Sequence, residues 1–143
     1  MTTLSSASSS PVLAARPSRR LARRAGAVLG GLATIFAVTT AIDVALHLTG
    51  VFPPLGQEMS GGLFLLALGY RIACGVAGCY VAARLAPDRP VAHALALGGV
   101  GLAISTAGAV AMWDAGPHWY SLAVIAISLP CAWLGGALRE RQR

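Results

Sequence analysis

The sequence contains no lysine, and it has few charged residues of any kind. Charged side chains make up 11% of the 143 residues, whereas a soluble domain has about a quarter. Hydrophobic residues make up 56%, and the mean hydropathy is +0.69. A soluble chain of this length has too little interior to bury so much apolar surface. The scarcity of charge therefore excludes a soluble globular domain and predicts a protein that lies in a lipid bilayer.

Aromatic residues and cysteines are scarce as well. The aromatic residues do not alternate with the arginines, so the net charge of +6 does not indicate binding to nucleic acid. The three cysteines, Cys74, Cys79 and Cys131, lie in apolar segments and form no C-x-x-C pair. This spacing argues against a zinc site or a disulfide framework and indicates small packing residues. We predict a protein that is not an enzyme and that has no cofactor and no metal.

Four apolar segments have the length of about 20 residues that a bilayer requires. We expect helices at about 27–49, 62–84, 91–113 and 118–138. Pro53 and Pro54 end the first segment, and Pro87 and Pro90 bracket a tight turn after the second. The predicted fold is an all-α integral membrane protein, with four transmembrane helices in two antiparallel hairpins over residues 25–139.

The distribution of arginine predicts the orientation of these helices. Every arginine except Arg71 lies in the N-terminal tail, the 84–90 turn or the C-terminal tail, and the loops 50–61 and 114–117 contain none. Cytoplasmic loops carry the excess of basic residues, so both termini are expected in the cytoplasm. Residues 1–24 are rich in Ser, Ala and Arg and are expected to be a disordered tail, and 140–143 a short cytoplasmic tail.

The arginines before the first apolar segment have two other interpretations. Ser18-Arg19-Arg20 could belong to a twin-arginine export signal, or the Ser- and Arg-rich start could be a transit peptide. The apolar run continues well past the roughly 7–15 residues of a signal peptide, and further apolar segments follow it. This length favours a basic flank that holds the first helix with its N-terminus in the cytoplasm.

Arg71 lies inside the second apolar segment, where an arginine costs about 2.5–3.5 kcal/mol. Asp43, in the first segment, is the only acid within any predicted span. In an antiparallel hairpin with the expected helix ends, the two residues lie within about one helical turn of the same level. We predict an intramembrane ion pair, with Thr40 and His47 completing its hydrogen bonds and Tyr70 as the nearest tyrosine.

Small residues share the face of the second helix on which Arg71 lies. They are spaced by about one helical turn and comprise Ala67, Cys74, Gly75, Gly78, Cys79 and Ala82. A separate stripe of larger residues consists of Leu65, Leu68, Ile72 and Val76. We expect the small face to approach other helices and the larger stripe to meet lipid.

His47 and His118 both lie near the outer ends of predicted helices, where a haem with two histidine ligands can be imagined. Nothing else in the sequence supports a haem site. We predict that both are interfacial histidines.

Several runs of sequence resemble small four-helix proteins of the bacterial inner membrane. They are YRIACGVAGCYVAARLAPDRP at 70–90, followed by AHALALGGVGL and later by GPHWYSLAV and LPCAWLGGALRE. The resemblance covers about residues 25–140. It implies this fold and a multi-pass location in the inner membrane, and it implies no activity.

The most direct functional hypothesis is a structural or accessory membrane protein whose partners are the bilayer and a larger membrane complex or further copies of itself. The alternative is a minimal oligomeric transporter or proton-coupled exporter that uses Asp43, His47 and Arg71. Small multidrug transporters also have four helices and an acid in the first. Here, however, Arg71 would neutralise that acid, and a single bundle with glycine faces leaves no lumen. A thiol or quinone oxidoreductase would need cysteine pairs at the outer face, which the sequence lacks.

Overall fold

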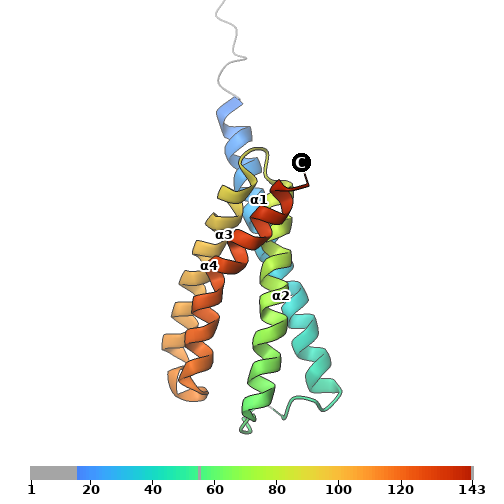
Figure 1. Cartoon of the computed structure of the whole chain (residues 1–143), viewed down its shortest axis with the longest axis vertical. Helices are drawn as coiled ribbons and strands as arrows, with labels where there is room; N and C mark the ends of the chain where they lie inside the picture. Colours follow the sequence, from blue (N-terminus) through green and yellow to red (C-terminus); the bar gives the residue numbers. More distant parts are fainter. Residues whose placement is uncertain (1–15, 55, 143) are drawn as a thin grey trace, which may run out of the picture.

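The computed structural model describes residues 16–54 and 56–142, and every regular element within them is helical. The elements are α1 (Arg16–Leu48), α2 (Gly61–Leu85), α3 (Pro90–Ala111), the 3-10 turn η2 (Trp113–Ala115) and α4 (His118–Glu140). The four α-helices are each long and apolar enough to cross a membrane, which confirms the expected all-α architecture. Consecutive α-helices run in opposite directions, so α2 and α4 are parallel (Figure 1).

Proline sets several of the helix ends. Ala86 precedes Pro87 and is extended, with ψ 130°, because a residue before proline is disfavoured in the helical region, and α2 therefore ends at Leu85. Pro90 is the first residue of α3, where its missing N–H interrupts no helical hydrogen bond. The ends of α2, α3 and α4 all lie within two residues of those expected from the sequence.

The first helix is longer than expected. It has 33 residues and begins at Arg16, so residues 16–24 are helical, although the sequence analysis assigns them to a disordered tail. Pro17 lies in the first turn, where proline is tolerated, and the Arg, Leu and Ala residues that follow are good helix formers. At 1.5 Å per residue α1 is about 50 Å long, and its first turns project beyond the other helices (Figure 1). The part of the expected tail at 1–15 lies outside the described residues.

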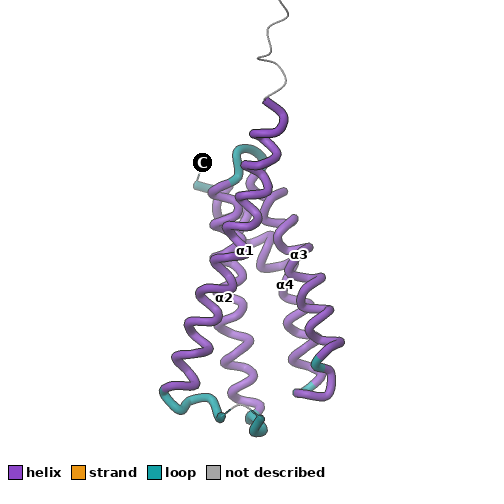
Figure 2. The backbone as a smooth tube through the Cα atoms, turned by 180° about the vertical axis from the view of Figure 1, so that it is seen from behind, coloured by secondary structure: helices purple, strands orange, loops and turns teal. Residues whose placement is uncertain are grey.

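The helices pack most closely at the end of the bundle that contains the 86–89 turn. The buried core there consists of small residues around one leucine: Cys79, Ala82, Ala83, Ala94, Leu97 and Ala132. Toward the other end, the α1–α2 hairpin and the α3–α4 hairpin diverge (Figures 1 and 2). Aromatic side chains connect the hairpins at that end, where Phe64 of α2 contacts Trp119 and Tyr120 of α4 at ring distances of 6.4 and 5.1 Å.

Two glycines allow helix backbones to meet in the closely packed half. A Cβ atom on Gly31 of α1 would lie 2.7 Å from both the Ala82 Cβ and the Gly78 carbonyl oxygen of α2. A Cβ atom on Gly135 of α4 would lie 2.6 Å from the Val76 carbonyl oxygen of α2. Both distances are shorter than real Cβ atoms show, so α1 and α4 pack directly on the backbone of α2. Close contact of this kind is what associates helices in lipid, where apolar side chains gain little by leaving the solvent.

Burial agrees in part with the two faces predicted for α2, since Leu68 and Val76 of the stripe of larger residues are half-buried. The small residues Ala67, Cys74, Gly78, Cys79 and Ala82 are buried. In contrast, the Leu65 side chain is 61% exposed and that of Ile72 is 37% exposed.

Replacing Gly135 with alanine tests this backbone contact. We expect Gly135→Ala to lower the free energy of unfolding in detergent by about 1–3 kcal/mol, because the added methyl group must displace α2. Gly99→Ala on α3 is the matched control, since no atom lies within 4 Å of a Cβ at Gly99. The control should be neutral or slightly stabilising, because alanine favours a helix more than glycine does. Equal stabilities for the two variants would contradict the close packing of α4 on α2.

Candidate functional site

Asp43 near the end of α1 and Arg71 in the middle of α2 meet across the first hairpin. Arg71 Nη2 lies 3.6 Å from Asp43 Oδ2. The Tyr70 hydroxyl donates a hydrogen bond to the other carboxylate oxygen, Asp43 Oδ1. Each oxygen of the carboxylate therefore has its own partner, and both partners come from α2.

A fourth polar group, from α4, lies beside this pair. Tyr120 is near enough to the Arg71 guanidinium for the two groups to interact electrostatically. We refer to Asp43, Tyr70, Arg71 and Tyr120 as the Asp43 cluster. The cluster joins three of the four long helices, two of them from the first hairpin and one from the second.

The Asp43 cluster is not sealed inside the bundle. The side chains of Asp43 and Arg71 are 32% and 38% exposed. Arg71 Nε is itself buried, and it has no hydrogen-bond partner among the described residues. The cluster thus balances the two full charges and leaves the buried Nε–H without a partner among the described residues.

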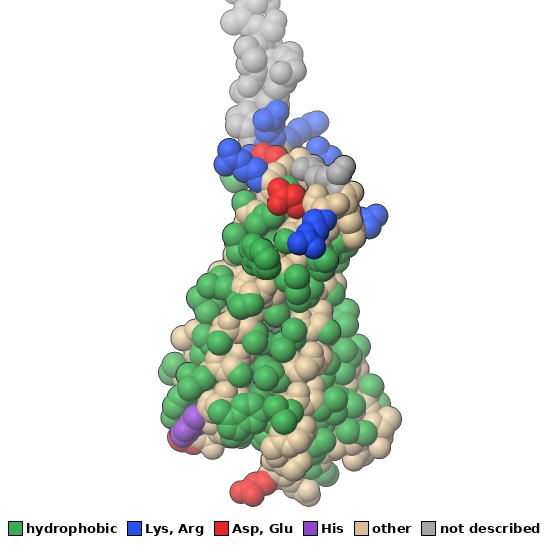
Figure 3. All heavy atoms as spheres, viewed as in Figure 1, with side chains coloured by type: hydrophobic (Ala, Val, Ile, Leu, Met, Phe, Trp, Pro, Cys, Tyr) green, Lys and Arg blue, Asp and Glu red, His purple; other side chains and the backbone are tan. Residues whose placement is uncertain are grey.

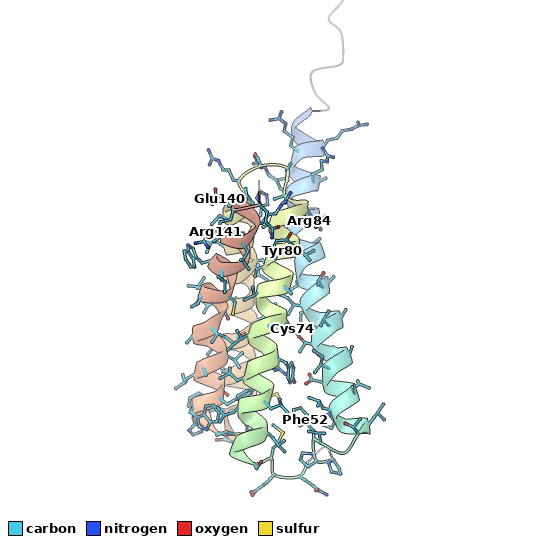
Figure 4. The ribbon with its side chains drawn as sticks, turned by 45° about the vertical axis from the view of Figure 1, so that its right-hand side comes forward. Phe52, Cys74, Tyr80, Arg84, Glu140 and Arg141 are labelled. Atoms are coloured by element: carbon cyan, nitrogen blue, oxygen red, sulfur yellow. The ribbon has the colours of Figure 1, made fainter. Side chains whose placement is uncertain are left out.

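Two of the residues predicted for this site lie elsewhere. His47 Nδ1 donates to the backbone carbonyl of Asp43, at 2.8 Å, and not to the carboxylate. The His47 ring also packs edge-on against Phe52, which is buried at the loop end of the bundle (Figure 4). Thr40 is exposed in a shallow apolar groove along α1, beside Phe36 and Val44. The structure therefore does not bring the side chains of Thr40 and His47 to the ion pair, and Tyr70 takes the place predicted for them.

Tyr120 is the member of the cluster that the sequence analysis misses. It follows Trp119 at the start of α4, and the sequence analysis assigns it no role. The available signal was its position, because α2 and α4 are parallel and both begin at the same end of the bundle. Placing Tyr120 level with the first half of α2 would have indicated its approach to Arg71.

The histidines and cysteines do not form a second site in the described residues. No group of three or more His, Cys, Asp or Glu side chains there could hold a metal ion. His118 stacks on Trp113 at a ring distance of 4.3 Å, so it and His47 each contact a different aromatic ring. The cysteines at 74, 79 and 131 are free and buried. The histidines and cysteines therefore serve as packing groups in this part of the structure.

The Asp43 cluster can do two things chemically. A neutral pair with a tyrosine on the carboxylate can link helices, because separating its members leaves a charge in a medium of low polarity. A carboxylate in contact with a hydroxyl can also accept or release a proton, which changes its attraction to the arginine.

Comparison with known proteins adds no family to this geometry. No family model, no curated protein and no solved structure matches the chain. The resemblance to bacterial inner-membrane proteins therefore remains an expectation, and the function has to be argued from the chain itself.

A double-mutant cycle tests whether Asp43 and Arg71 interact. We expect Asp43→Ala and Arg71→Ala each to lower the free energy of unfolding in detergent by about 3 kcal/mol, because each leaves an unpaired charge. The double variant should recover much of that loss, with a coupling energy of at least ~1 kcal/mol.

Asp114→Ala is the control for this cycle, because Asp114 lies in η2 and outside the cluster. We expect it to leave stability unchanged. Strictly additive effects of the Asp43 and Arg71 substitutions would show that the two side chains do not interact.

Proposed function

We propose that the chain is a structural or accessory protein of the bacterial inner membrane that works within a larger membrane complex or as an oligomer. In this proposal the Asp43 cluster is the main polar interaction between the helices. It holds α1 and α2 in register and links α4 to them. The observation that carries this proposal is the pairing of both Asp43 oxygens with groups of α2 while Tyr120 approaches from α4. A group whose partners are all supplied by neighbouring helices is suited to holding them together.

The proposed orientation places both chain termini in the cytoplasm. It is supported by the arginines of the described residues other than Arg71, which gather at the end of the bundle with the 86–89 turn (Figure 3). Arg84 of α2 and Arg141 after α4 lie at this same end (Figure 4). The opposite end has the acidic residues Glu58 and Asp114 in its loops and no arginine among its described loop residues.

The second candidate is a minimal oligomeric transporter in which Asp43, His47 and Arg71 line a path between copies of the chain. The partial exposure of the Asp43 and Arg71 side chains favours it, because a substrate or a proton could reach them from the surface of the bundle. The closely packed half of the bundle opposes a path through one copy, so transport would require more than one.

Complementation by the double variant separates the two candidates. A strain that lacks the protein would receive the variant with both Asp43→Ala and Arg71→Ala, and the amount of protein in the membrane would be measured together with the phenotype. A structural role predicts that restored abundance also restores function. Normal abundance with the phenotype of the deletion would reject the structural role and favour transport.

Reporter fusions test the orientation. We expect a reporter that is active only in the cytoplasm to function when fused after Arg143 and to fail when inserted at Gly56, which lies in the 49–60 connection. The reason is the concentration of arginine on the other side of the membrane, counted over short loops where this bias is most reliable. Activity of the reporter at Gly56 would overturn the proposed topology.

A further inference from the structure

A polar pocket of about 270 Å³ lies at the arginine-rich end of the bundle, between α1 and the start of α3. Its lining has two parts. Arg24, Asp88, Arg89 and His93 form a polar rim, and Ala92 and Ala96 form an apolar wall. The pocket shares no residue with the Asp43 cluster, so the two are separate sites.

An ion pair shapes one side of the rim. Arg24 Nη2 lies 2.5 Å from Asp88 Oδ2, and both side chains are about half exposed, at 48% and 44%. The hydrogen bond from Arg24 lowers the pKa of Asp88, so this carboxylate is ionised at neutral pH. Its other oxygen, Asp88 Oδ1, is buried and has no hydrogen-bond partner among the described residues. The half-exposed carboxylate therefore contributes a negative charge to the rim.

The other side of the rim has an exposed cation and a further acceptor. The Arg89 side chain is exposed, and its backbone is left-handed, with φ 43°, an uncommon conformation for a residue with a Cβ. His93 Nδ1 donates to the Arg89 carbonyl at 3.2 Å, so in the neutral ring Nε2 is an acceptor. The rim therefore presents guanidinium donors next to two acceptors.

The apolar wall continues from this rim along α3. Ala92, Ala96 and Gly99 are exposed on α3. Because alanine has only a methyl group and glycine has no side chain, nothing projects far from this face of the helix. An acyl chain that begins at the rim can lie along this surface. A ligand that fits both parts has a phosphate for the arginines, a hydrogen-bond donor for the acceptors and a hydrocarbon tail for the alanines.

We propose that this pocket binds the headgroup of a glycerophospholipid with a primary ammonium group, of the ethanolamine type. The phosphate accepts from Arg24 and Arg89, and the ammonium donates to His93 Nε2 and lies beside the half-exposed Asp88 carboxylate, whose charge attracts it. Basic pockets between helices on the cytoplasmic side are known features of lipid recognition. The proposal rests on the membrane location proposed above, since the pocket then lies at the level of the lipid headgroups.

Binding of lipids with identical acyl chains to the full-length protein in detergent tests the proposal. Native mass spectrometry would give the affinity for lipids with ethanolamine, choline and glycerol headgroups. We expect the ethanolamine lipid to bind at least about fivefold more tightly than the choline lipid, whose trimethylated nitrogen cannot donate. Equal affinity for these two lipids would overturn the proposal, and so would preferred binding of the glycerol lipid.

Three variants assign the contacts. Arg89→Gln should weaken both the ethanolamine and the choline lipid about fivefold, because it removes a cation near the phosphate. Asp88→Asn should reduce the preference for ethanolamine to about onefold, because it removes the charge that attracts the ammonium. Arg84→Gln is the matched control, an exposed arginine at the same end of the bundle but outside the pocket, and should change neither affinity. A loss with Arg84→Gln equal to that with Arg89→Gln would show general charge attraction and overturn the proposed site.

Soluble competitors distinguish a lipid from a free phosphate compound. We expect millimolar glycerophosphoethanolamine and inorganic phosphate to leave the bound lipid in place, because they lack the tail that contacts Ala92 and Ala96. Displacement by either would show that the pocket serves a soluble phosphate compound. These measurements are made in detergent and do not depend on orientation, so a failed topology test and a failed lipid test are separate results.

Discussion

The closeness of three helix backbones in the arginine-rich half of the bundle is the constraint on which the rest of the structure depends. A leucine side chain is in an equally apolar environment whether it contacts lipid or another helix. Burial of apolar side chains alone therefore cannot hold the helices together. Gly31 and Gly135 instead let α1 and α4 reach the backbone of α2, and alanines fill the remaining core. Because α2 is contacted by both helices, its position determines where the other polar groups can meet. The two hairpins join at this contact and diverge away from it (Figure 2).

The divergence explains why charged and aromatic groups are needed in the other half. Small residues no longer bring the backbones together there, and longer side chains have to span the space between the helices. Asp43 and Arg71 do so within the first hairpin, and Phe64 and Tyr120 do so between the hairpins. The guanidinium is the longest and most versatile of these groups, with donors that point in several directions. This capacity explains why an arginine is present inside a membrane span, although a shorter side chain would have a lower free energy of insertion.

The sequence predicted the parts of this structure that depend on single strong signals. Proline determines where α2 ends and where α3 begins. Asp43 is the only acid in the predicted spans, which makes it the expected partner for Arg71. What the sequence did not predict depends on geometry between helices. Tyr70 was predicted to belong to the polar cluster as the nearest tyrosine, but its hydrogen bond to the Asp43 carboxylate was not predicted. The arginines before Ala25 were interpreted as a topological or targeting signal, although they also belong to α1, which begins at Arg16.

The parallel contact between α2 and α4 has a consequence for biogenesis. Gly31 and its partners on α2 belong to the first half of the chain, and their contact can form as soon as the first hairpin has entered the bilayer. The contact of Gly135 with α2 is different, because α4 leaves the ribosome only after α2 and α3. Until then the small-residue surface of α2 around Val76 is uncovered in the membrane. The time between synthesis of α2 and of α4 is therefore the interval in which a chaperone, or the wrong neighbouring helix, has access to the centre of the bundle.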